Sequence, residues 1–216
     1  MFTRVCILGV FDADDKILGL CYTPQKGGER MTDVRKLARY LLLLFKEQME
    51  DISEEEFDIT PMKLQKLLYY CQGYSLALTG KPMFEEEIGA WQYGPVVPAV
   101  YREYKAYGGR NIPLRVVGGD VHDIDDVDAS IARLVVREKG SMSGIALANM
   151  THKEAPWKDT YAGLYSNGTI SNETLKEFFD AALQQKELCE EEEDKLWLSV
   201  GEPLSDEDWE ELLAKV

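Results

Sequence analysis

The stretch from Thr60 to Tyr107 constrains the fold more than any other part of the sequence. Its first half predicts a buried helix between a start signal, Thr60-Pro61, and a stop signal formed by Gly80 and Pro82. Mostly apolar positions recur between these signals at helical spacing: Leu64, Leu67, Leu68, Cys71, Ser75 and Leu78. A chain organised around such a helix is expected to be mainly α.

The second half of this stretch predicts a short extended segment followed by another helix. Ile88–Tyr93 is rich in aromatic residues and too short for a helix, so we expect it to be extended. The pair Gly94-Pro95 is expected to break the chain and to preset the helix that starts there. The apolar face of that helix comprises Val97, Val100, Tyr101 and Tyr104.

Periodic apolar positions also predict helices before and after this stretch. One helix begins near Met31 and ends near the acidic run Glu50–Glu56, and later helices follow Asp123–Asp128, Gly140 and Ser171. The stripe of the first helix comprises Val34, Leu37, Ala38, Leu41, Leu42 and Phe45. We therefore expect a single, mainly α domain of six or seven helices with minor short β-structure.

Two motifs in the chain resemble a known family. The string KLQKLLYYCQGYSLALTGKPMFEEEIGAWQYGPVVPAVYREYK is similar to the Panacea domain of SocA-like antitoxins, a domain also found in phage-associated proteins. The string THKEAPW, Thr151–Trp157, resembles the second motif of that family. The resemblance runs from about Met31 to about Asp180, and it implies a soluble, mostly helical domain that neutralises a partner toxin by binding it directly.

The resemblance also supplies candidate partner-binding or motif positions. These positions are Lys63, Gln65, Lys66, Tyr69, Trp91, Tyr93, Gly94, Pro95, Tyr101, His152 and Trp157.

The sequence predicts three parts: an N-terminal extension over 1–30, a Panacea-like domain over 31–185, and an acidic C-terminal tail with a short helix over 186–216. Within the extension, two apolar runs ending at Phe11 and Cys21 predict a β-hairpin. An alternative is that residues 1–30 come from translation of the sequence upstream of the native start codon. Codons for the residues just before Met31 can spell a purine-rich ribosome-binding site, which makes Met31 a candidate native start.

Net charge and cysteine usage limit the classes of partner and the location. A formal net charge of −15 disfavours general nucleic-acid binding, because it opposes the phosphate backbone. It favours a basic partner, or it serves only solubility.

The four cysteines, Cys6, Cys21, Cys71 and Cys189, have no C-x-x-C spacing, and we expect reduced thiols. Because no membrane span or signal peptide is recognisable, we expect a cytoplasmic protein.

Signals for an enzyme are weak, so we expect no catalysis, cofactor or metal. His122 lies in an acidic run that favours a capped helix start; metal binding is the alternative, although the run lacks the pattern of a calcium loop. His152 has neither zinc-ligand spacing nor a neighbouring nucleophile, but a pair with Cys71 remains an alternative. The glycines form no nucleotide-binding fingerprint.

Several charged residues are expected on solvated faces of the two helices in the central stretch. These residues are Lys63, Lys66, Arg102 and Lys105, and pairing with acids of a toxin is the functional alternative.

Aromatic residues in this stretch are dense enough to serve either the core or an interface. Tyr69, Tyr70 and Tyr74 do not share one helix face, so we expect some of them to reach the surface. Trp91 and Trp157 are expected to have structural roles.

The function predicted from these features is that of an antitoxin that binds a cognate protein toxin. One alternative is a proteolytic adaptor that delivers the toxin to a protease, using Trp197 and Trp209 of the tail as a second contact. A second alternative is a transcriptional regulator of its own operon, and a third is an enzyme that uses His152.

Overall fold

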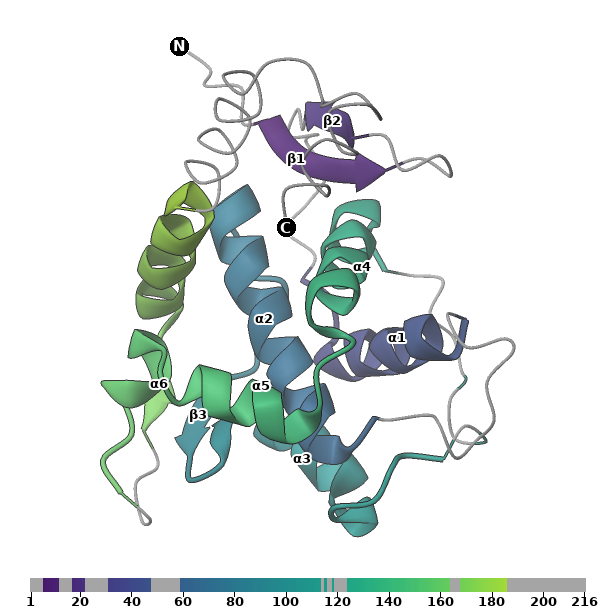
Figure 1. Ribbon diagram of the computed structural model, residues 1–216, viewed down its shortest axis with the longest axis vertical. Coiled ribbons are helices and arrows are strands. Elements are labelled where there is room, and N and C mark those ends of the chain that lie inside the picture. Colours follow the sequence, from purple (N-terminus) through teal and green to yellow (C-terminus); the bar gives the residue numbers. More distant parts are fainter. Residues whose placement is uncertain are drawn as a thin grey trace, which may run out of the picture. The chain divides into compact units, whose positions relative to one another are not determined.

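A computed structural model of the protein describes residues 6–11, 17–21, 31–47, 59–113, 115, 118, 124–163 and 168–185. The described residues form seven α-helices: α1 (Val34–Glu47), α2 (Pro61–Thr79), α3 (Pro98–Tyr104), α4 (Asp126–Lys139), α5 (Gly144–Thr151), α6 (Ala155–Lys158) and a helix over residues 172–185 (Figure 1). A short 3-10 helix, η1 (Lys105–Tyr107), follows α3. The predicted mainly α fold is confirmed.

The strands among the described residues form two small antiparallel sheets. One pairs β1 (Cys6–Phe11) with β2 (Ile17–Cys21), which confirms the predicted hairpin. The other contains β3 (Ile88–Trp91), β4 (Gly94–Val96) and β5 (Thr169–Ile170) in the order β4-β3-β5. Trp91 pairs with Gly94, so β3 and β4 are joined by a two-residue turn, Gln92-Tyr93, which we call the β3–β4 turn.

Close contacts divide the chain into two compact units, Met1–Phe179 and Asp180–Val216. Only residues 180–185 of the second unit are described. The helix predicted in the acidic tail and the metal alternative at His122 lie outside the described residues.

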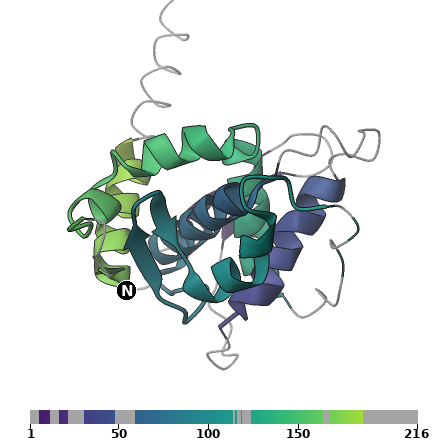
Figure 2. The same ribbon diagram turned by 90° about the horizontal axis from the view of Figure 1, so that it is seen from below.

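Helix α2 is the centre of the first unit. Thr60 accepts a hydrogen bond from the Lys63 N–H at 3.2 Å, Pro61 opens the helix, and Gly80 ends it with a φ of 73°. These are the predicted start and stop signals. The helix contacts α1, α3, α4, α5 and β4, and Figure 2 shows it in the middle with α1 and α5 on different sides. As a result, every residue from Lys63 to Leu76 is buried.

This burial corrects two predictions about α2. Lys63 and Lys66 are not solvated, since only 2% and 1% of their surfaces are exposed. Tyr69, Tyr70 and Tyr74 do not reach the surface either, because all three are buried. Both predictions assumed a helix with one apolar face, whereas α2 has packed neighbours on all sides. The predicted stripe of α1, in contrast, is entirely buried.

The pair Gly94-Pro95 does not start a helix, which corrects a third prediction. Both residues belong to β4, and α3 begins at Pro98. Gly94 has a φ of 94°, a left-handed conformation that suits the residue leaving a tight turn. Pro95 is tolerated because β4 is an edge strand of its sheet.

Candidate partner-binding site

Two adjacent side chains of α2 hold strand β4 in place. The Lys66 Nζ donates a hydrogen bond to the Pro95 carbonyl at 2.9 Å. The Gln65 Oε1 accepts a hydrogen bond from the Val97 N–H at 2.7 Å. The family-like residues of α2 therefore fix the backbone that follows the β3–β4 turn.

Burying the Lys66 ammonium costs electrostatic free energy. Burial lowers the pKa of Lys66 to about 7, because desolvation penalises the charged ammonium. Gly94 permits the close approach of the turn to this group. A β-carbon at Gly94 would lie 2.7 Å from Lys66 Nζ and 2.8 Å from Thr151 Oγ1, so a larger residue would displace both.

The second motif packs against the first from the α5–α6 side. The Trp157 Nε1 donates a hydrogen bond to the Trp91 carbonyl at 2.8 Å. The Thr151 hydroxyl and the His152 N–H both donate to the Ala148 carbonyl, each at 3.0 Å, at the end of α5. The half-buried Trp157 packs against the core, as predicted.

The His152 ring lies against Trp157, with 4.1 Å between the ring centroids. Burial, assisted by the nearby positive charge of Lys66, lowers the pKa of His152, although a hydrogen bond with the Gln92 backbone opposes the shift. The imidazole is therefore expected to be neutral at neutral pH. Its contacts are structural, to Trp157 and to the backbone of the β3–β4 turn.

Glu154 connects the two motifs, and the sequence reasoning missed it. The Tyr69 and Tyr70 hydroxyls each donate a hydrogen bond of 2.8 Å to one of its carboxylate oxygens. Burial raises the pKa of Glu154, while the two tyrosine hydrogen bonds and the charge of Lys139 oppose that shift. The sequence contained one signal for this contact: the second motif holds an acid, and the first motif holds two consecutive tyrosines.

Aromatic rings continue from these buried contacts to the surface. Trp91 contacts Tyr101 edge-to-face with 5.0 Å between ring centroids, and Trp157 stacks on Tyr161 at 4.6 Å. Tyr101 is 36% exposed, and Tyr93, in the β3–β4 turn, is 63% exposed. We call the following set the aromatic face: Trp91, Tyr93, Tyr101, His152, Trp157 and Tyr161. The contacts above link its rings, except that of Tyr93, which belongs to the set because its turn directly follows Trp91.

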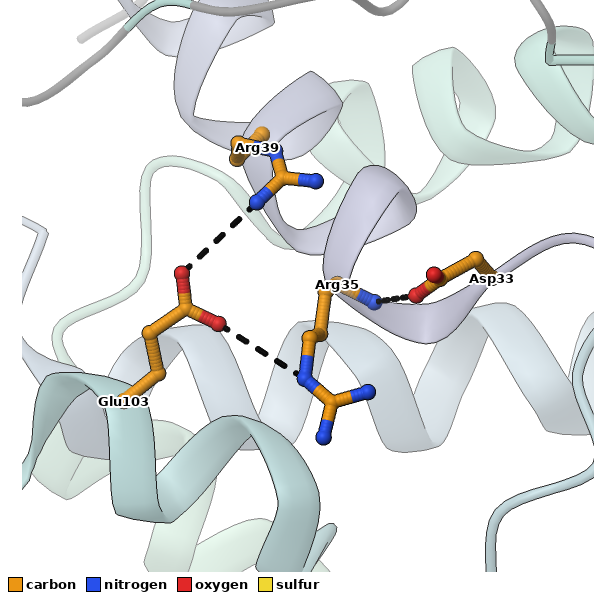
Figure 3. Close-up of polar contacts among 4 residues, drawn as sticks. All are labelled: Asp33, Arg35, Arg39 and Glu103. Carbon is orange, nitrogen blue, oxygen red and sulfur yellow. Dashed lines mark hydrogen bonds and ion pairs between the residues drawn. The ribbon is translucent and has the colours of Figure 1, made fainter.

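Basic residues accompany the aromatic face. Arg102 and Lys105 are exposed beside Tyr101 in the chain, and Lys153 and Lys158 are exposed beside His152 and Trp157. The acid between Arg102 and Lys105 is Glu103, whose carboxylate lies 4.0 Å from Arg35 Nε and 3.7 Å from an Arg39 guanidinium nitrogen (Figure 3). Two arginines of α1 therefore offset the charge of Glu103.

The acidity of the chain lies elsewhere. The described residues between 31 and 185 carry 17 Lys and Arg against 15 Asp and Glu, a formal charge of +2. The rest of the chain carries 7 against 24, a formal charge of −17. The charge argument against nucleic acid therefore applies to the rest of the chain and not to the described residues taken by themselves.

The structure brings together ten of the eleven predicted site residues. They meet where α2, β3, β4, α3 and the α5–α6 segment converge, and the exception is Lys63. The Lys63 ammonium lies 5.0 Å from the centre of the Phe45 ring, and its backbone is capped by Thr60 at the start of α2.

The part of the chain that the structure describes also bears on a metal site, a membrane helix and a thiol pair. No three metal-ligating side chains gather there, and no helix there is long and apolar enough to cross a bilayer. Cys71 is fully buried, and burial raises the pKa of its thiol, which disfavours the thiolate that a Cys71–His152 pair requires.

Comparisons with known proteins identify relatives of the central part of the chain. The family described as "Antitoxin SocA-like, Panacea domain" matches residues 64–158, a range that contains every residue of the aromatic face except Tyr161. A curated relative, "Antitoxin SocA" of Caulobacter vibrioides (strain NA1000 / CB15N), is 34% identical over 136 residues, covering 58% of this chain and 68% of the relative. No solved structure matches the chain.

Proposed function

The chain belongs to the SocA-like antitoxin family with a Panacea domain, and we propose that it neutralises a cognate protein toxin by binding it directly. The observation that carries the proposal is the position of Tyr93. This side chain is 63% exposed, yet the strand that follows its turn is held by the buried side chains of Gln65 and Lys66. An exposed tyrosine on a backbone held in this way is a typical anchor of a protein interface.

The proposed mechanism is steric. The antitoxin either covers a substrate or product site of the toxin or holds the toxin in an inactive conformation, and both modes require an interface of roughly 1,200 Å² or more. Neither mode requires catalysis, a cofactor or a metal. We place this encounter in the cytoplasm.

Co-expression with the product of the neighbouring gene tests the proposal. We expect the neighbour alone to stop growth, the pair to grow, and the two proteins to purify together in a fixed ratio. A vector without the antitoxin gene and an inactive variant of the neighbour are the controls. Rescue without a complex would contradict direct binding.

The toxin level distinguishes direct binding from the adaptor alternative. Direct binding leaves the toxin present but inactive, whereas an adaptor lowers the amount of toxin and loses its effect in a strain that lacks the protease. A rescue that depends on the protease would therefore replace the proposal with the adaptor mechanism.

A further inference from the structure

We infer that the aromatic face receives an acidic segment of the toxin, with Tyr93 as the central anchor. The inference rests on the proposed function, because it assigns the surface and the partner chemistry of the same site.

The exposed apolar side chains indicate that the aromatic face is a binding surface. Among the described residues, the exposed large apolar side chains are Met31, Tyr93, Tyr101 and Ile145. Two of these four, Tyr93 and Tyr101, belong to the aromatic face, where Trp91 links the turn to α3. Tyrosine provides large contact area with few rotatable bonds, so little entropy is lost when a partner covers it.

The backbone under Tyr93 is fixed before any partner arrives. Hydrogen bonds from Trp157 to the Trp91 carbonyl and from Lys66 to the Pro95 carbonyl hold the strands on either side of the turn. Burying a lysine to hold an edge strand is expensive, and a simple connection between two strands does not require it. Such preorganisation lowers the cost of binding.

The charged side chains around the aromatic face indicate the charge of the partner. The exposed groups on and next to the face are basic at Arg102, Lys105, Lys153 and Lys158, and the exposed acids next to these four in sequence are Glu103 and Asp159. Glu103 is already approached by two arginines of α1. A surface with this balance complements an acidic protein segment and repels a basic one. Nucleic acid is also negatively charged, so it is the alternative partner that the test below separates from an acidic protein segment.

The test measures the Kd between the full-length antitoxin and an inactive form of the toxin encoded by the neighbouring gene. We expect Tyr93→Ala to raise the Kd about 30-fold or more. We expect Lys105→Glu, one helical turn beyond Tyr101, to raise it about 10-fold, with an effect that shrinks at high salt. Ile145→Ala and Lys81→Glu are matched controls outside the face, and both should keep the wild-type Kd within about twofold.

Every other outcome of these measurements contradicts one specific part of the inference. If wild-type protein binds and both face variants bind equally well, the interface lies elsewhere while the proposed function stands. If Lys105→Glu tightens binding, the partner segment is not acidic. If the purified antitoxin carries nucleic acid that Tyr93→Ala releases, the face belongs to a nucleic acid. Absence of binding by the wild-type protein overturns both this inference and the proposed function.

Discussion

Helix α2 and the β3–β4 turn both belong to the family match, but they differ in what their side chains do. Every residue from Lys63 to Leu76 is buried, whereas Gln92 and Tyr93 of the turn are exposed. The Lys66 ammonium and the Gln65 side-chain oxygen of α2 form hydrogen bonds within the fold, whereas the ring of Tyr93 is exposed and is our proposed contact with a partner. Resemblance to a family therefore groups buried and exposed residues together, and only the structure separates them.

Removing the acceptor of the two α2 tyrosines is expected to have the largest effect on stability. Glu154→Ala leaves the Tyr69 and Tyr70 hydroxyls buried without their acceptor, and each costs about 1–3 kcal/mol. Urea unfolding should show a loss of about 3 kcal/mol in the free energy of unfolding. Glu177→Ala, on an exposed position, is the control. A loss no larger than that of the control would show that α2 does not depend on Glu154.

A methyl group at the junction between α2 and the turn is expected to cost somewhat less. Gly94→Ala forces a φ of 94° on alanine and places its β-carbon against Lys66 and Thr151, which should cost about 2 kcal/mol. Gly109→Ala is a matched control, since a β-carbon there meets nothing within 4 Å. Thermal unfolding compares the two variants, and equal melting temperatures would contradict the close packing of the turn.

The buried Lys66 predicts a pH dependence of stability. Its pKa is lowered from 10.5 to about 7 in the folded state, so the unfolded state binds more protons at this site between those values. The free energy of unfolding should therefore rise with pH in this range, by about 1–2 kcal/mol between pH 7 and 9. Above that range, Cys71 and the α2 tyrosines lower the free energy of unfolding as the pH rises, because burial raises their pKa values.

Lys66→Met isolates this contribution. The variant should lose the rise in the free energy of unfolding between pH 7 and 9, measured by urea unfolding at several pH values. Lys81→Met, at an exposed position just after α2, should keep the rise. A Lys66→Met protein with the wild-type slope would show that Lys66 is not desolvated in the folded state.

The exposed turn residue is expected to have the smallest effect on stability. Tyr93→Ala should change the free energy of unfolding by less than about 0.5 kcal/mol, because its side chain is 63% exposed. The same variant should fail to protect cells from the toxin. Protection by a stable Tyr93→Ala protein would remove the distinction between the turn and α2.

Local signals in the sequence were sufficient for the framework of the fold. Thr60-Pro61 and Gly80 predicted the limits of α2, because caps and helix breakers act on neighbouring backbone. The apolar runs at the N-terminus predicted the first hairpin for the same reason.

Features that depend on distant residues were not predictable in this way. The burial of Lys66 depends on strand β4, 29 residues later, and the role of Glu154 depends on tyrosines 84 and 85 residues earlier. The net charge of −15 also concealed a described region of charge +2, since a sum over the chain does not show where the charges lie.

Hydrogen exchange of the antitoxin, free and bound to its toxin, tests the central claim most directly. We predict that binding slows exchange at the amides of Gln92, Tyr93 and the Tyr101–Lys105 segment, while the amides of α4 keep their rates. Unchanged exchange in the β3–β4 turn, with protection confined to α4, would contradict the assignment of the aromatic face as the toxin-binding surface.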